Sequence, residues 1–222
     1  MIQHWERQLQ NVLPDKPDLI VLPELCDRPA KSAYPAERRL EFYKQRGNQI
    51  RDFFAEKAKA HYCYIAYATH VVMPDGSLRN STLLINRNGE VDGIYNKNHL
   101  VVEERTRNNT YYGKDAPIFE TDFGRVACVI CFDLNFDELR LKYVKEKPDL
   151  IVFCSAYHGG LMQQYWAYSC RAHFVGSVYP PAPNTMISPV GEIVASSTNY
   201  YQYITETVNL DCAVIHIDYN GS

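Results

Sequence analysis

An α/β domain, with helices packed outside β-sheets, is the fold class that this sequence predicts. Stretches with helical spacing of apolar residues alternate with short apolar strands and with hairpin signals. The segment Lys-Pro-Asp-Leu-Ile-Val also occurs twice, at 16–21 and 147–152, and each copy follows a predicted helix and opens a buried strand. The 222 residues contain no linker or low-complexity tract, so we expect one domain over 1–222.

The first half of the chain is expected to hold two helices and four strands. Apolar residues at helical spacing predict a helix over 2–13, which Pro14 ends. A loop is expected over 26–36, and a long amphipathic helix over 37–60. Asn88-Gly89 is a strong hairpin signal between the last two strands. The four strands are predicted at 18–22, 62–72, 80–86 and 90–97.

The second half begins with a polar segment, 98–117, that is expected to be irregular. Two helices are predicted, over 137–147, where Pro148 follows, and over 161–172. The strands of this half are expected at 118–121, 125–131, 149–156, 173–179, 185–188, 193–195 and 211–218.

The composition is ordinary for a soluble globular protein, with 46% hydrophobic and 22% charged residues. The net charge of −3 gives no electrostatic reason to expect nucleic acid or an anionic membrane as a partner. No apolar run approaches the roughly 18 residues that span a bilayer, and the N-terminus lacks the apolar core of a signal peptide. A cytoplasmic location is therefore expected.

Seven scattered cysteines do not suggest a disulfide framework, and most are expected to be small buried hydrophobic residues. Cys128 and Cys131 form a C-x-x-C pair, which could indicate redox or zinc chemistry. Residues three apart on a strand point to opposite faces, and no second C-x-x-C exists for a zinc site, so neither reading is favoured. Cys131 stands out because it ends an apolar strand ahead of a charged helix, a common place for a nucleophile.

A nucleophilic cysteine needs a nearby base or cation, because a thiol pKa near 8.5 leaves only a few per cent thiolate at about pH 7. Glu24 follows the predicted strand 18–22, and Lys97 ends the predicted strand 90–97. If these strands share a sheet edge, a carboxylate, an ammonium and the Cys131 thiol converge. The alternative is that both charges are solvated and merely follow strands.

Three segments resemble the signature segments of the nitrilase superfamily of carbon–nitrogen hydrolases, and they occur in the family's order. These are Leu19–Glu24, Tyr95–Leu100 and Val129–Asp133. Weaker similarity surrounds Trp166 and Ser188–Glu192, so the resemblance covers nearly the whole chain. It implies a four-layer α-β-β-α sandwich. Because this chain starts at the first helix, the sandwich is expected to lack the family's first strand.

The resemblance also implies a Glu-Lys-Cys triad that needs no metal or organic cofactor. By motif position, Glu24 is the general base and Cys131 attacks the substrate carbon to form a thioester. Lys97 and the backbone N–H of Phe132 stabilise the oxyanion. These roles agree with the physics of a buried carboxylate beside a thiol and of an ammonium beside developing negative charge.

Further site residues are expected in the loops. Many family members have a second catalytic glutamate after the lysine segment, for which Glu104 is the candidate and Glu103 the alternative. With Phe132, Ala156 and Tyr157 are the substrate-binding candidates. The loop 25–36, the segment 101–117 and the stretch 156–158 are expected to form pocket walls, and the family often has an arginine where this chain has Asn135. The residues that could either contact substrate or serve structure are Tyr34, Tyr111, Tyr112, His99, His158 and Trp166.

We therefore predict a thiol-dependent hydrolase of a carbon–nitrogen bond in a small amide or carbamoyl compound. Nitrile hydrolysis and acyl transfer to an acceptor amine remain open within the enzyme class. The alternative from another class is a non-catalytic relative that binds a ligand or partner with the same sandwich. The expected partners are a small-molecule amide substrate and further copies of the chain. Neither nucleic acid nor a membrane is expected as a partner. The resemblance implies a homodimer or higher homo-oligomer through 137–147 and 161–172.

Overall fold

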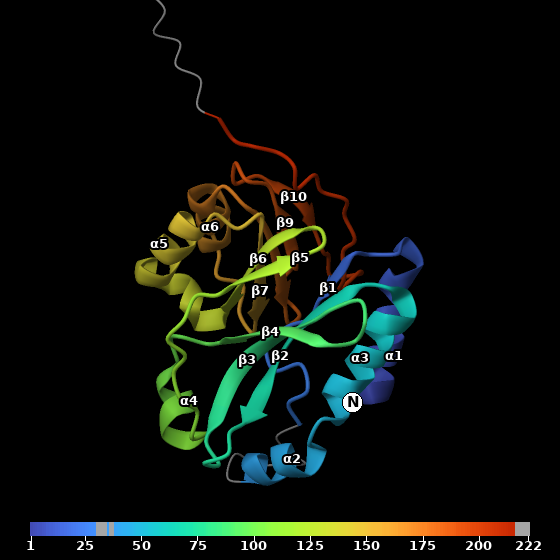
Figure 1. Ribbon diagram of the computed structural model, residues 1–222, viewed down its shortest axis with the longest axis vertical. Helices are drawn as coiled ribbons and strands as arrows, with labels where there is room; N and C mark the ends of the chain where they lie inside the picture. Colours follow the sequence, from blue (N-terminus) through green and yellow to red (C-terminus); the bar gives the residue numbers. More distant parts are fainter. Residues whose placement is uncertain (30–34, 36–37, 216–222) are drawn as a thin grey trace, which may run out of the picture.

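Two β-sheets lie face to face, and helices cover the outer side of each sheet (Figure 1). This computed structural model describes residues 1–29, 35 and 38–215. Apolar side chains from both sheets form one core between them, and β3 contacts β6 while β1 contacts β7 and β8. The predicted α-β-β-α sandwich is confirmed.

The first sheet has four strands in the order β1-β2-β3-β4. β1 (Leu19–Val21) runs parallel to β2 (Tyr64–Val72), and β2, β3 (Leu78–Ile85) and β4 (Val91–Asn96) form an antiparallel meander. β1 lies at the edge, and no strand within the described ranges pairs with its other side. The ends of β1 and β4 therefore lie two strands apart, on either side of β2 and β3.

The second sheet has six strands in the order β10-β9-β8-β7-β6-β5. Its centre is parallel and is made of β6 (Gly124–Ile130), β7 (Leu150–Ser155) and β8 (His173–Val178). β7 is buried along its whole length, as expected for a parallel strand covered on both faces. The antiparallel flanking strands are β5 (Ile118–Thr121), β9 (Thr185–Ile187) and β10 (Ile193–Ser196).

Helices form the two outer layers. On the first sheet, α1 (Ile2–Val12) and α3 (Gln49–His61) bury apolar side chains such as Leu9 and Phe54 in a second core cluster. On the second sheet, α5 (Asp137–Glu146) and α6 (Met162–Cys170) pack against each other and cover β6 to β9 (Figure 1). In the described part of the chain, no helix has the length and apolar character needed to cross a membrane.

The predicted helix over 37–60 is two helices, α2 (Arg39–Arg46) and α3, separated at Gly47 and Asn48. Gly47 has a φ of +52°, a left-handed conformation that glycine adopts without a Cβ penalty and that ends α2. The start of the predicted helix, residue 37, lies outside the described residues. The continuous helix was predicted because amphipathic spacing continues across the break.

Two other predictions about secondary structure are wrong. Residues 98–117 are not all irregular, because α4 (Val102–Arg107) forms a short helix within them. Its six residues are too few and too polar to show an apolar period. Of the strand predicted over 211–218, residues 211–215 are irregular and the remaining positions lie outside the described residues.

The cysteines of the described structure are free, and most are buried as predicted. Burial raises the pKa of the Cys63 thiol to about 11 and those of Cys154 and Cys170 to about 12. A thiol whose pKa is higher in the folded chain than in the unfolded chain stabilises the fold at pH values below the unfolded pKa. That contribution is lost as pH rises towards the folded pKa.

We therefore expect the melting temperature of the reduced protein to stay level from about pH 7 to 8.5 and to fall at higher pH. The fully buried Cys154 alone should account for about 1.4 kcal/mol of unfolding free energy per pH unit above the unfolded thiol pKa. Cys154→Ala should be less stable at pH 7 but lose stability less steeply above pH 9. Equal slopes for the two proteins would contradict this expectation.

Candidate active site

Two carboxylates and one ammonium form a buried cluster at the ends of the first-sheet strands. Lys97 Nζ lies 2.8 Å from Glu24 Oε1 and 2.9 Å from Glu104 Oε2. The exposed fractions are 1% for Lys97, 5% for Glu24 and 7% for Glu104. No three His, Cys, Asp or Glu side chains in the described part of the chain are grouped so that they could hold a metal ion. The carboxylates instead face an ammonium.

Backbone hydrogen bonds beyond the strand ends hold Glu24 and Lys97 in place. After β1, Leu22 N–H donates to the Ala66 carbonyl at 2.9 Å and Cys26 N–H to the Ala68 carbonyl at 3.1 Å. Glu24 lies between these two anchors. After β4, Lys97 N–H donates to the Asn80 carbonyl at 2.8 Å and prolongs the β3–β4 pairing.

α4 presents Glu104 rather than Glu103 to the cluster. Glu104 Oε2 accepts a hydrogen bond from Val101 N–H at 3.0 Å, so the carboxylate also caps the first turn of its own helix. Glu103 is exposed and faces Arg107 at 3.6 Å. Of the two glutamates considered from the sequence, the structure brings Glu104 to Lys97 and leaves Glu103 outside.

Cys131 begins a 3-10 turn, Cys131–Asn135, directly after β6, which ends at Ile130 and not at Cys131 as predicted. Its φ of +46° is unusual for a residue with a side chain and costs about 1–3 kcal/mol. The chain turns sharply there, so the thiol leaves the sheet and is partly exposed. Such a turn presents a nucleophile to solvent on a rigid support.

A buried carboxylate two residues after the cysteine stabilises this turn. Asp133 accepts hydrogen bonds from Tyr95 Oη at 2.6 Å, His99 N–H at 2.7 Å and Ile130 N–H at 3.3 Å. The His99 ring stacks on Phe136 with centroids 3.7 Å apart. Asp133 thus joins the segment around Lys97 to the turn around Cys131, and His99 acts in that contact rather than at the thiol.

The thiol of Cys131 is protonated at neutral pH. Burial and the charge of Glu24 raise its pKa to about 12, outweighing the lowering by Lys97. Lys97 remains charged. Burial lowers its pKa, but the charges of Glu24, Cys131 and Glu104 raise it by more, so the pKa lies above that of an ordinary lysine. The site therefore holds a neutral thiol beside a carboxylate that can take its proton.

The segment after β7 lies against the cysteine. The backbone of Ala156 lowers the pKa of the Cys131 thiol. Tyr157 is half-buried, and its hydroxyl accepts a hydrogen bond from Asn135 Nδ2 at 2.8 Å. Asn135 also donates to the Phe132 carbonyl at 3.1 Å. Where the family often has an arginine, Asn135 thus joins the cysteine turn to Tyr157 by hydrogen bonds between uncharged groups.

Other aromatic residues singled out from the sequence are not placed at the cysteine. Tyr111 and Tyr112 are exposed, and the Tyr111 ring packs under the guanidinium of Arg105 at 4.2 Å. Trp166 is fully buried in the core and donates to a backbone carbonyl. Tyr34 lies outside the described residues.

Asn80 is a member of the cluster that the sequence analysis treated only as the start of a strand. Its Nδ2 lies 2.7 Å from Glu24 Oε1 and 2.8 Å from Glu104 Oε1. The available signal was the polar run Arg79–Thr82 at the start of an otherwise apolar strand. That run does not say which side chains face the core, so the sequence alone did not single out Asn80.

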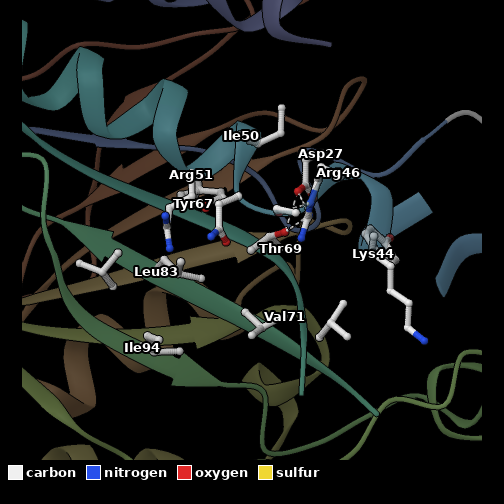
Figure 2. A pocket seen from close by; sticks show the side chains of 15 residues that line it. Asp27, Lys44, Arg46, Ile50, Arg51, Tyr67, Thr69, Val71, Leu83 and Ile94 are labelled. Carbon is white, nitrogen blue, oxygen red and sulfur yellow. Dashed lines mark hydrogen bonds and ion pairs between the residues drawn. The ribbon is translucent and has the colours of Figure 1, made fainter. Parts of the chain in front are cut away.

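A cavity of about 510 Å³ lies elsewhere, between the α2–α3 junction and the outer face of β2 to β4 (Figure 2). Apolar side chains from the strands, including Val71, Leu83 and Ile94, line it. Its Arg46 is paired with Asp27 and hydrogen-bonds Thr69 at 2.7 Å. Asp27, from the loop predicted to form a pocket wall, lines this cavity, but the predicted catalytic residues do not. The candidate active site is therefore the cluster at Cys131.

The comparison with protein families decides the identification. The carbon–nitrogen hydrolase family model matches residues 1–206. This chain belongs to the carbon–nitrogen hydrolase family. The resemblance to the nitrilase superfamily found from the three motifs is confirmed.

Similar proteins within this family include a probable nitrilase, C965.09, of Schizosaccharomyces pombe, 40% identical over 73 residues. That match covers 33% of this chain and 26% of the relative. The deaminated glutathione amidase of Rattus norvegicus is 30% identical over 107 residues, which are 44% of this chain and 32% of the relative. The matched regions are thus about a quarter to a third of these carbon–nitrogen hydrolases.

A solved structure supports the fold. Nit3 of Saccharomyces cerevisiae, a member of branch 10 of the nitrilase superfamily, superimposes with a TM-score of 0.77 and 18% sequence identity. The superposition covers 89% of this chain and 79% of that chain. At this identity the similarity establishes the fold of the carbon–nitrogen hydrolase family.

Removing the ammonium should destabilise the fold strongly, because two buried carboxylates would lose their cation. We expect Lys97→Met to lower the free energy of unfolding by about 3–5 kcal/mol. Lys57→Met is a matched control, since Lys57 pairs with Glu6 at 2.7 Å on the surface and should contribute at most about 1 kcal/mol. Urea denaturation of both variants measures the difference. Equal, small effects would show that Lys97 is not held as a buried charge.

Proposed function

We propose that this protein is a thiol-dependent hydrolase of the carbon–nitrogen bond in a small amide or carbamoyl compound. The observation that carries the proposal is geometric: Cys131 lies on a turn with a φ of +46°, and near it the buried carboxylate of Glu24 is held by Lys97 at 2.8 Å. A strained cysteine turn, a base within reach and a buried cation together supply the parts of a nucleophilic mechanism.

In the proposed first half-reaction, Glu24 takes the Cys131 proton while the sulfur attacks the carbonyl carbon. A carbon–sulfur bond forms and the carbonyl oxygen becomes an oxyanion, which the Lys97 ammonium and the backbone N–H of Phe132 stabilise. Collapse of this intermediate breaks the carbon–nitrogen bond. Glu24 gives its proton to the leaving nitrogen, so ammonia or an amine departs and a thioester remains on Cys131.

In the second half-reaction, Glu24 takes a proton from water, and the resulting hydroxide attacks the thioester carbon. Collapse breaks the carbon–sulfur bond and releases the acid, and the proton on Glu24 returns to the sulfur. Glu104 does not exchange protons in this scheme. Its two oxygens are engaged by Lys97, Val101 N–H and Asn80, so it fixes the ammonium.

The substrate class is proposed as a small amide or carbamoyl compound. The names of the relatives, one a deaminated glutathione amidase and one a probable nitrilase, support carbon–nitrogen chemistry of this kind. Tyr157, held by Asn135, and the exposed Ala156 would line the substrate side of the thiol. Acyl transfer would follow if an amine rather than water took the acyl group.

Self-association is proposed through α5 and α6, which correspond to the predicted segments 137–147 and 161–172. Exposed large apolar side chains on these helices include Leu141 on α5 and Tyr165 and Tyr168 on α6. Such side chains mark interaction surfaces when they gather on one face. A cytoplasmic location is part of the same proposal.

We predict that Cys131→Ala abolishes ammonia release from a panel of small amides and carbamoyl compounds while the melting temperature stays within a few degrees of the parent. The matched control is Cys170→Ala, which removes a buried thiol from α6, away from the cluster. This control should retain turnover. Hydrolysis by Cys131→Ala at the parent rate would refute the assignment, and absence of any hydrolysis by the parent would favour the non-catalytic alternative.

A further inference from the structure

Asn80 contacts the candidate active site through both its backbone and its side chain. It lies on β3, opposite His70 on β2, and its exposed fraction is 0%. Its backbone carbonyl accepts the N–H of Lys97. Its side-chain amide lies between Glu24 and Glu104.

Both hydrogen-bonding contacts of the Asn80 side chain are donations to carboxylates. Nδ2 lies 2.7 Å from Glu24 Oε1 and 2.8 Å from Glu104 Oε1. Oδ1 is buried without a hydrogen-bond partner among the described residues. A buried carbonyl oxygen without a partner is unfavourable, so the two carboxylates, rather than any donor to Oδ1, fix the orientation of this amide.

The cluster has more negative charge than its single ammonium neutralises. Lys97 reaches both glutamates, and nearby like charges disfavour each other's ionisation. Donors that hydrogen-bond the charged form of a carboxylate favour ionisation. Asn80 supplies two such donors without adding a charge, one for each glutamate.

We infer that Asn80 is a positioning residue whose amide holds the carboxylates of Glu24 and Glu104 on either side of Lys97. The amide of Asn80 and the ammonium of Lys97 both donate to Oε1 of Glu24, so Oε2 retains its capacity to accept the Cys131 proton. This inference rests on the proposed function, because it concerns readiness of Glu24 as the base.

The other groups that face Asn80 do not supply the same effect. Across the sheet, burial and the charges of Arg46 and Lys97 lower the pKa of His70 to about 3, so this imidazole stays neutral above pH 5. Its Nε2 lies 3.4 Å from Thr110 Oγ1. The charged or titratable partners of Asn80 are therefore the two carboxylates, with Lys97 and Cys131 beyond them.

The test is the pH dependence of Cys131 alkylation by iodoacetamide, followed by peptide mass spectrometry from pH 5 to 9. In Asn80→Asp, an oxygen replaces Nδ2 between two carboxylate oxygens, so the cluster ionises less readily. The acid limb of the profile is the pH range over which the rate of Cys131 alkylation rises. We expect this limb to move about one pH unit higher, so that alkylation at a pH below the limb is roughly tenfold slower than in the parent protein. The rate should recover above it, which a merely structural defect would not allow.

Asn86→Asp is the matched control. Asn86 also donates to two carboxylates, Glu90 at 3.3 Å and Asp92 at 2.6 Å, but it lies beyond the opposite end of β3. The same charge change there should leave the Cys131 profile unchanged. If Asn80→Asp does not fold, Asn80→Ala removes the donors without adding charge and should move the limb in the same direction by a smaller amount.

The outcomes separate this inference from the proposed function. A parent protein whose Cys131 reacts preferentially, with Asn80 variants that keep the parent profile or slow equally at every pH, would overturn the inference alone. A parent protein whose Cys131 reacts no faster than the other cysteines would overturn the proposed function, and the inference with it. A shifted limb in the Asn80 variants and an unshifted one in Asn86→Asp would support the inference.

Discussion

The ammonium of Lys97, buried between Glu24 and Glu104, is the interaction on which the rest of the site depends. A buried charge is stable only when it is paired and hydrogen-bonded, and here one partner, Glu24, lies 73 residues before Lys97 and the other, Glu104, lies seven residues after it. The end of β1, the end of β4 and the short helix α4 must all be in place for the charges to meet. The charges of the cluster can therefore pair only when the strands of the first sheet are arranged in the observed order.

A second network stabilises the strained turn at Cys131 and connects it to the first. Tyr95 and His99 bind Asp133, while Lys97, between them in the sequence, binds Glu24. The same short segment thus fixes the turn that carries the thiol and the cation that faces it. This arrangement explains how one sheet can position the proposed base and the other the proposed nucleophile.

Sequence reasoning predicted the parts of the site that local pattern controls. Glu24 follows a short apolar strand, and Lys97 lies at the end of a strand that the hairpin signal Asn88-Gly89 locates, so the sequence could place both strand ends. Glu104 was named only through resemblance, because its position depends on a six-residue helix with no apolar period. Asn80 and the left-handed backbone at Cys131 were missed, since tertiary contacts rather than local sequence determine which strand residues face inward and where a turn is strained.

The most direct test of the central claim is the ionisation state of Lys97, followed by NMR of the ¹³Cε-labelled lysines from pH 7 to 10. The signal is assigned by its loss in Lys97→Met. Paired with two carboxylates, Lys97 should remain an ammonium across this range, because its pKa is raised above that of an ordinary lysine. A Lys97 signal that titrates below the surface lysines would mean that burial outweighs the carboxylates, and the proposed cluster would then not exist as a set of charges.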